Sequence, residues 1–255
     1  VDARIPLSSR NPDIDELGKN KARLILMNKS DLADEEAGKL WSAYFQKKGY
    51  YVVSLDSRNR NGMKQVTAVV MEACKEKIER DRKRGIMNRP VRAMVVGIPN
   101  VGKSTFINSY AGKACAKTGN KPGVTKGKQW IRLNKSVELL DTPGILWPKF
   151  EDKVVGERLA FVGSVKDQIL DIEYLAMRLL DTLRPEYTAA LAERYKLDAD
   201  AVNEMESFEL LELIARKRGM LISGGEVNTE RAAIMLLDEF RSGAIGRITL
   251  EMVPQ

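Results

Sequence analysis

The sequence predicts an α/β domain followed by a small all-helical domain. Short runs rich in Val, Ile and Leu alternate with helical patterns, which is typical of βαβ units on a mostly parallel sheet. Beyond about residue 168 only helical patterns follow, and the charge changes sign, from 23 basic against 10 acidic groups over 58–168 to 10 against 16 over 169–255. We therefore expect domains at 1–168 and 169–255. The apolar runs expected as strands are 22–27, 51–55, 91–96 and 137–140.

Helical periodicity predicts three further elements. The first is a helix over 63–84, apolar on one face at its start and basic at its end. In the second domain, Ser207 is expected as the N-cap of a helix over 208–218. Its inward stripe is Phe208, Leu211, Ile214 and Ala215. The last is a helix over 229–241, with Ala233, Leu236, Leu237 and Phe240 inward.

Composition excludes several kinds of chemistry. The 255 residues include no histidine, so His-dependent catalysis is ruled out, and Cys74 and Cys115 alone cannot complete a zinc site. Two cysteines so far apart predict free thiols in a reducing compartment such as the cytoplasm. No apolar run approaches the roughly 18 residues of a membrane span. The sequence begins at Val1 rather than Met, and we expect further residues upstream.

The basic segment 58–168 has two possible interpretations. It can face a polyanionic partner such as a nucleic acid, or it can be a solvated helix surface. Charge alone leaves both open.

A glycine-rich loop, Gly97-Ile98-Pro99-Asn100-Val101-Gly102-Lys103-Ser104, lies between the third apolar run and a helical pattern over 105–111. This is the context of the phosphate-binding loop, whose backbone N–H groups surround a phosphate at a helix N-terminus. Lys103 is expected at the β- and γ-phosphates and Ser104 on Mg²⁺. The other expected nucleotide contacts of this loop are Pro99, Asn100, Val101, Gly102 and Thr105.

A second motif, Asp141-Thr142-Pro143-Gly144, follows the fourth apolar run. At the carboxyl edge of a parallel strand, Asp141 can reach a phosphate-bound Mg²⁺, usually through water. The Gly144 N–H can contact a γ-phosphate. Between the two motifs, the Gly- and Lys-rich segment 117–128 is typical of a mobile loop in which Thr125 meets Mg²⁺ and the γ-phosphate. An ordinary solvated loop is the alternative.

A third motif, Asn28-Lys29-Ser30-Asp31, ends the first apolar run. The Asp31 carboxylate can accept hydrogen bonds from guanine N1 and N2, where adenine has no matching pair. Asn28 is expected to tie this loop to the phosphate loop, and the Lys29 stem to cover the base. Alone, the four residues could be a helix cap, but together the three motifs predict GTP and GDP as ligands.

A weaker signal is the segment 54–57, whose backbone N–H groups would complete the base pocket through Ser54, Asp56 and Ser57. Asp56-Ser57 does not match the usual Ser-Ala-Lys pattern of a base loop well.

The order of the motifs is unusual, because conventional GTPases place NKxD and the base loop last and this sequence places them first. The sequence therefore resembles the circularly permuted GTPases, and within them the bacterial and organellar YlqF/RbgA family. The resembling stretches are DARIP at 2–6, NKSD at 28–31, GIPNVGKST at 97–105, KPGVTKG at 121–127, DTPGILWPKF at 141–150, KRG at 217–219 and GAIGR at 243–247.

The resemblance implies a P-loop G domain that hydrolyses GTP and acts in late assembly of the large ribosomal subunit, with ribosomal RNA and subunit proteins as partners. It also implies a helical domain that contacts RNA. Because this domain is net acidic, we expect most phosphate contacts at 80–92 and 117–128, with only a local patch at Arg216, Lys217 and Arg218. We expect no membrane partner and no small-molecule substrate other than GTP.

Catalytic residues are scarce in the sequence. Ile145 stands where Ras-like enzymes carry a water-orienting Gln, and it cannot hydrogen-bond. The resemblance implies that a histidine in an upstream segment does this work, which leaves Thr125 and Gly144 to position the γ-phosphate and water. By resemblance to potassium-stimulated GTPases, Asn100 would help to hold K⁺, although a simple turn residue is the alternative. Slow intrinsic hydrolysis with stimulation by the subunit is expected.

The permuted order also predicts a switch, since residues 145–165 connect the γ-phosphate sensor directly to the helical domain. Ordering of this segment by GTP would reorient that domain. Two alternatives remain: a nucleotide-gated RNA-binding switch with negligible turnover, and a GTPase of tRNA modification, against which the permuted order argues.

Overall fold

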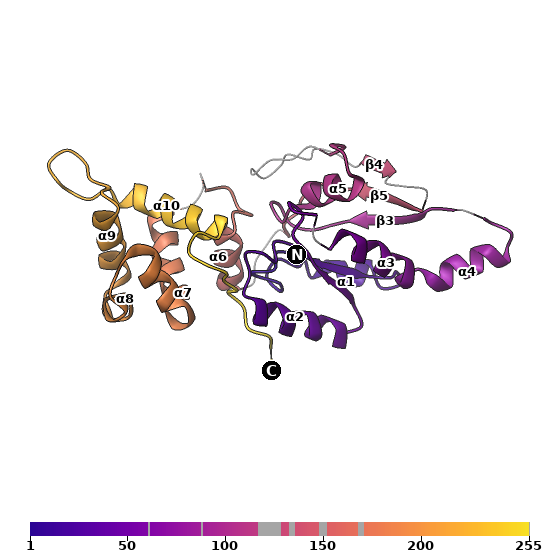
Figure 1. The fold of residues 1–255 in the computed structure, drawn as a ribbon, viewed down its shortest axis with the longest axis horizontal. Coiled ribbons are helices and arrows are strands. Elements are labelled where there is room, and N and C mark those ends of the chain that lie inside the picture. Colours follow the sequence, from indigo (N-terminus) through magenta and orange to yellow (C-terminus); the bar gives the residue numbers. More distant parts are fainter. Residues whose placement is uncertain are drawn as a thin grey trace. The chain divides into compact units, whose positions relative to one another are not determined.

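The computed structural model describes residues 1–60, 62–87, 89–116, 129–132, 136–147, 152–167 and 171–254, in two compact units (Figure 1). The first unit is Val1–Lys149 together with Glu251–Gln255, and the second is Phe150–Leu250. The boundary therefore falls before the predicted residue 168, because α6 (Lys153–Phe161) packs against helices of the second unit. The return of the last five residues to the first unit was not predicted.

Ten elements lie in the described part of the first unit. They are α1 (Asp13–Leu17), β1 (Leu24–Met27), α2 (Glu35–Lys47), β2 (Tyr51–Ser54), α3 (Met63–Ala73), α4 (Lys75–Lys83), β3 (Val91–Val95), α5 (Lys103–Ala111), β4 (Gln129–Arg132) and β5 (Val137–Asp141). All four predicted strands are present, with ends that differ by one or two residues. β4 was not predicted.

The described strands form two sheets, each of which contains one parallel pair. β1 pairs with β2, and β3 pairs with β5, whose other edge carries the antiparallel β4. Met27 is in register with Ser54, and Val95 with Asp141. In a parallel pair, the carboxyl ends of both strands lie at the same edge of the sheet. The loops that follow the two strands therefore begin side by side.

Two apolar clusters hold these sheets. Trp41 and Phe45 of α2 pack on Ile25 and Met27 of β1. The second cluster contains residues of both sheets and of α3 and α5, which makes them one core. Its buried members are Val53, Leu55, Val66, Phe106, Ile107, Ile131, Val137 and Leu139.

The single helix predicted over 63–84 is instead two helices, which break at Cys74. α3 buries Val66 in the core, whereas α4 buries no residue and extends away from the sheets (Figure 1). No apolar face holds α4 in line with α3, so helical continuity is not enforced by packing.

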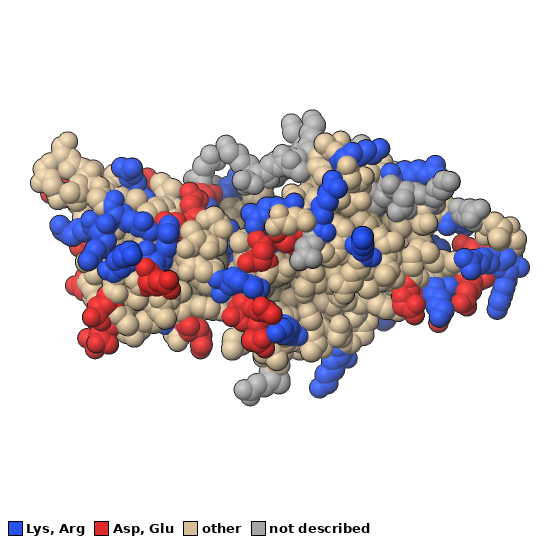
Figure 2. All heavy atoms as spheres, in the orientation of Figure 1, with Lys and Arg blue, Asp and Glu red and all other residues tan. Residues whose placement is uncertain are grey.

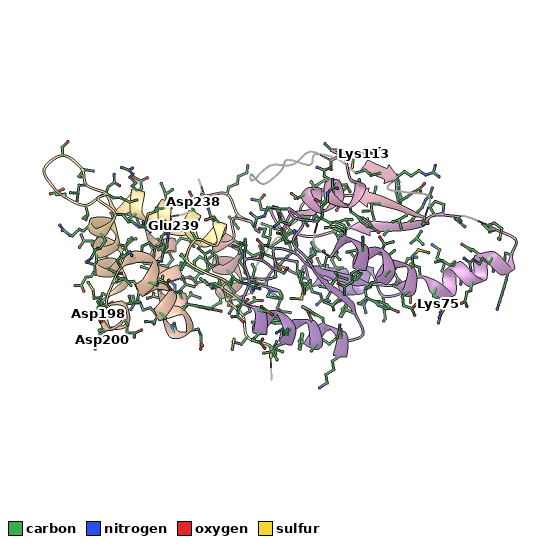
Figure 3. The ribbon with its side chains drawn as sticks, viewed as in Figure 1. Lys75, Lys113, Asp198, Asp200, Asp238 and Glu239 are labelled. Carbon is green, nitrogen blue, oxygen red and sulfur yellow. The ribbon has the colours of Figure 1, made fainter. Side chains whose placement is uncertain are left out.

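The regular elements of the second unit, in its described part, are all helices. They are α6, α7 (Ile172–Tyr195), α8 (Ala199–Glu204), α9 (Ser207–Lys217) and α10 (Thr229–Ser242). Glu239 of α10 joins three of these helices: it accepts hydrogen bonds from Arg194 Nε (2.9 Å) and the Tyr195 hydroxyl (2.8 Å) of α7, and Arg218 after α9 lies 3.4 Å away (Figure 3). None of the described helices could cross a membrane.

Two details predicted for α9 are wrong. The N-cap is Glu206, because the Ser207 hydroxyl lies inside the helix and bonds to Asp181 and Arg184 of α7. Phe208 is 48% exposed, and Leu210 takes the inward place beside Leu211, Ile214 and Ala215. The inward stripe predicted for α10 is confirmed, since all four of its residues are buried.

Candidate nucleotide-binding site

The phosphate loop connects β3 to α5. Gly102 is the N-cap of α5 with φ +90°, and Asn100 also has a left-handed φ of +60°. The backbone N–H groups of the first turn of α5 point out of the helix N-terminus, where an anion can accept them. Lys103 folds back over the loop, and its Nζ donates to the Ile98 carbonyl at 2.8 Å.

The Asn28 side chain brings three of the predicted loops together. Its Nδ2 donates to the carbonyl of Val101 in the phosphate loop at 2.7 Å. Its Oδ1 accepts from the Ser57 backbone N at 3.1 Å and from the Ser57 hydroxyl at 2.8 Å. Gly102 allows this approach, because a Cβ there would lie 2.3 Å from Asn28 Nδ2.

Asp31 lies next to this junction with half of its carboxylate available. Oδ2 pairs with the guanidinium of Arg58, whereas Oδ1 is buried without a hydrogen-bond partner among the described residues. A buried acceptor without a donor is costly, and guanine N1–H and N2–H are donors of the required kind. Arg58 was not predicted, and nothing in the sequence beyond its position after Ser57 indicated it.

The other residues of the base loop lie in different places. Asp56 is buried and holds the loop, since its Oδ1 accepts from Arg58 N at 2.9 Å and its Oδ2 from Asn59 Nδ2 at 2.6 Å. Ser54 is exposed at the end of β2, with its hydroxyl 3.4 Å from that of Ser42. The structure therefore brings Ser57 to Asn28, whereas the Asp56 side chain bonds within the base loop and the Ser54 side chain bonds to neither.

The Asp141–Gly144 segment lies against the phosphate loop. Thr142 Oγ1 donates to the Val95 carbonyl at 2.7 Å, and Ile145 N donates to the Gly97 carbonyl at 3.4 Å. At Gly144, a Cβ would lie 2.7 Å from the Pro99 backbone and 3.0 Å from Lys103 Nζ. A residue with a Cβ would clash there, so only glycine fits. Because Gly144 lies against Pro99 and Lys103, its backbone is close to the place predicted for phosphate.

The pKa values of two charged residues of the phosphate site, Lys103 and Asp141, are shifted. Burial lowers the pKa of Lys103 to about 8, against the opposing charge of Asp141. Burial raises the pKa of Asp141, an effect that Lys103 opposes, and Asp141 Oδ1 is buried without a hydrogen-bond partner in the described chain. Ionisable groups with such shifts are frequent in functional sites.

The remaining predicted residues are not all described. Ser104 and Thr105 lie in the first turn of α5. Thr125 and the rest of 117–128 lie outside the described residues, as do 148–150 of the DTPGILWPKF stretch.

The fold and the site define a P-loop GTPase with permuted motif order. A family model described as 50S ribosome-binding GTPase matches residues 92–205, so Asn28–Asp31 precedes it. The chain is 47% identical to Ribosome biogenesis GTPase A of Bacillus cereus, over 98% of this chain and 84% of the relative, and 32% identical to that of Thermotoga maritima, over 98% and 83%.

Solved structures agree with the sequence relatives. A crystal structure of GNP-bound YlqF from T. maritima matches with a TM-score of 0.67 at 29% identity, over 98% of this chain and 89% of that one. A GDP-bound structure of TM YlqF matches with a TM-score of 0.69. The chain belongs to the ribosome biogenesis GTPase A family. It is a GTP-hydrolysing enzyme that serves ribosome assembly, and the predicted family, fold class and enzyme class are confirmed.

The pKa of Lys103 predicts how nucleotide binding depends on pH. Phosphate binding favours the charged amine, so above pH 8 the protein must take up a proton when it binds GDP, and affinity falls by up to about tenfold per pH unit. Calorimetry in buffers of different ionisation enthalpy should show little proton uptake at pH 7 and about one proton at pH 9. Lys113→Gln, at an exposed lysine after α5 (Figure 3), should leave this profile unchanged. A pH-independent affinity would contradict the assignment.

Proposed function

We propose that the site around Asn28 binds GTP and GDP with Mg²⁺, and that the chain uses this nucleotide cycle in assembly of the large ribosomal subunit. The convergence of three predicted loops on one side chain carries the proposal, because each of these loops is independently expected to contact the nucleotide. The matching family is described as 50S ribosome-binding GTPase, which supports the large subunit as partner. The GDP- and GNP-bound structures of T. maritima YlqF support the ligands.

In this proposal the guanine base lies between Asn28, Lys29 and Asp31. Asp31 reads N1–H and N2–H, which requires its pair with Arg58 to open or shift. The Lys29 stem covers one face of the base, and the backbone at Ser54, Asp56 and Ser57 completes the pocket. The phosphates lie along Pro99–Thr105, where Lys103 and the N-terminus of α5 offer positive charge.

The residues present fit Mg²⁺ next to the phosphates. Asp141 Oδ1 is buried without a partner in the described chain, and a cation nearby would stabilise its charged form. Ser104 Oγ, Asp141 and Thr125 are the proposed ligands, with phosphate and water oxygens completing the set, as Mg²⁺ usually prefers. When bound, the ion neutralises charge on the β- and γ-phosphates. Asn100 is proposed to help hold a K⁺ ion next to the phosphates.

Hydrolysis by this chain alone is proposed to be slow. The side chain of Ile145 is 61% exposed and can orient no water. Turnover of the free protein should therefore be on the order of 10⁻⁴ per second, as for unstimulated Ras. The subunit would supply the stimulation, and residues 145–165 would pass the state of the nucleotide to the helical unit.

Turnover with and without purified large subunits tests this function. We expect stimulation of about tenfold or more by the subunit, and a further difference between K⁺ and Na⁺. Small subunits are the control. Equal rates in all conditions would support the alternative, a binding switch with negligible turnover.

In the same preparations, proteolysis at residues 147–153 should differ between GDP and a GTP analogue, and identical cleavage would contradict the switch.

The ribosomal RNA surface is proposed to lie first on the GTPase unit. Arg80, Arg82, Lys83 and Arg84 of α4 and its end are exposed and form no ion pair within the described residues. In Figure 2, Lys and Arg gather at the far end of this helix, with Asp and Glu between them nearer its start at Lys75 (Figure 3). Arg92 contributes less, because it pairs with Glu138 at 3.0 Å.

The salt dependence of subunit binding separates the two basic surfaces. Neutralising Arg82, Lys83 and Arg84 to Gln should lower the slope of log K against log salt by about 2. The matched control neutralises Arg216, Lys217 and Arg218, of which Arg218 already lies near Glu239. It should change the slope by less. A larger change in the control than in the α4 variant would contradict the proposed order.

A further inference from the structure

The first residues of the chain lie along the loop proposed to hold the base. Asp2 forms a parallel bridge with Asn28 at the end of β1. Asn28 N donates to the Val1 carbonyl at 3.0 Å, and Ala3 N donates to the Asn28 carbonyl at 2.9 Å. The backbone N–H and the carbonyl of Asn28 are therefore both bonded to this segment. These bonds hold residues 1–3 beside Asn28 as they would hold a neighbouring strand.

Asp2 is a fully buried carboxylate surrounded by donors. Arg4 gives three hydrogen bonds, from its backbone N (3.1 Å) and Nε (2.9 Å) to Oδ1 and from Nη2 (2.8 Å) to Oδ2. The fourth contact is Lys29 Nζ, 3.0 Å from Oδ2. Although burial alone would raise the pKa of Asp2, Arg4 and Lys29 hold it well below its usual range. Asp2 is therefore charged at any pH at which the protein works.

Lys29 needs such an anchor. Its backbone has a left-handed φ of +59°, which is unfavourable for a side chain with Cβ. Burial lowers the pKa of its amine, and Asp2 is the group that opposes this effect. An unanchored lysine would turn its charge toward solvent, and its stem would leave the base site.

We infer that Asp2 is a positioning residue for the base site, which holds the Lys29 side chain in the place where it covers guanine. This inference rests on the proposed function, in that it takes the base to lie between Lys29 and Asp31. Arg4 fills the remaining acceptor positions of Asp2, so one carboxylate orders both cations. The segment DARIP thereby gains a role in nucleotide binding that no motif of the GTPase set gives it.

A double-mutant cycle on GDP affinity tests the inference in the full chain. Asp2→Asn should weaken GDP binding by about tenfold or more, the range of one charge-assisted hydrogen bond. Lys29→Met, which keeps the stem and removes the charge, should weaken it by a similar factor. In the Lys29→Met background, Asp2→Asn should cause almost no further loss. Equal losses in both backgrounds would show that Asp2 acts through the fold, and would overturn the inference.

Controls distinguish this from loss of structure. Asp15→Asn removes a carboxylate that also pairs with arginine, at Arg23 (2.9 Å), but lies away from the base loop, and should leave GDP affinity unchanged. If Asp2→Asn does not fold, Ser9→Ala replaces it, because Ser9 Oγ accepts from Asp2 N at 2.9 Å. This variant should weaken GDP binding only when Lys29 is present. No GDP binding by the unaltered chain would instead refute the proposed function itself.

Discussion

The side-chain amide of Asn28 is the contact on which the arrangement of the candidate site depends. One amide group joins the loop after β1, the loop after β2 and the phosphate loop after β3, and it uses donor and acceptor together. Such a buried amide tolerates little displacement, because each lost partner leaves a polar atom unsatisfied. The two sheets share a core beneath it, so packing and hydrogen bonding support the same geometry.

This contact explains why the permuted order does not prevent assembly of the site. The motifs are far apart in sequence, yet the parallel pairs place each loop at a carboxyl edge of a sheet, where side chains can meet regardless of chain order. The order changes the connections instead. The chain leaves the GTPase unit for the helical unit shortly after Gly144, and it returns to the GTPase unit at Glu251. The return is firmly held: Glu251 accepts from Leu7 N and Ser8 N, and its carbonyl accepts from Trp41 Nε1.

Sequence reasoning predicted most of what depends on local pattern. Strand positions followed from short apolar runs, and the phosphate loop from glycines between a strand and a helix. The missed features depend on tertiary contacts. The break at Cys74 reflects a loss of packing beyond α3, and the Ser207 hydroxyl is taken by α7 instead of capping α9. Arg58 and the role of Asp2 were missed because an ion pair between residues far apart in sequence leaves no periodic signal, even when, as for Asp2 and Lys29, both residues belong to recognised stretches.

Asn28 joins the base loop to the phosphate loop through its side-chain amide. Asn28→Asp tests this role most directly, because the shape is kept while the donor facing the Val101 carbonyl becomes an acceptor. Titration with GDP should show affinity reduced by about tenfold or more, with unchanged circular dichroism. Unchanged GDP affinity in this variant would contradict the account.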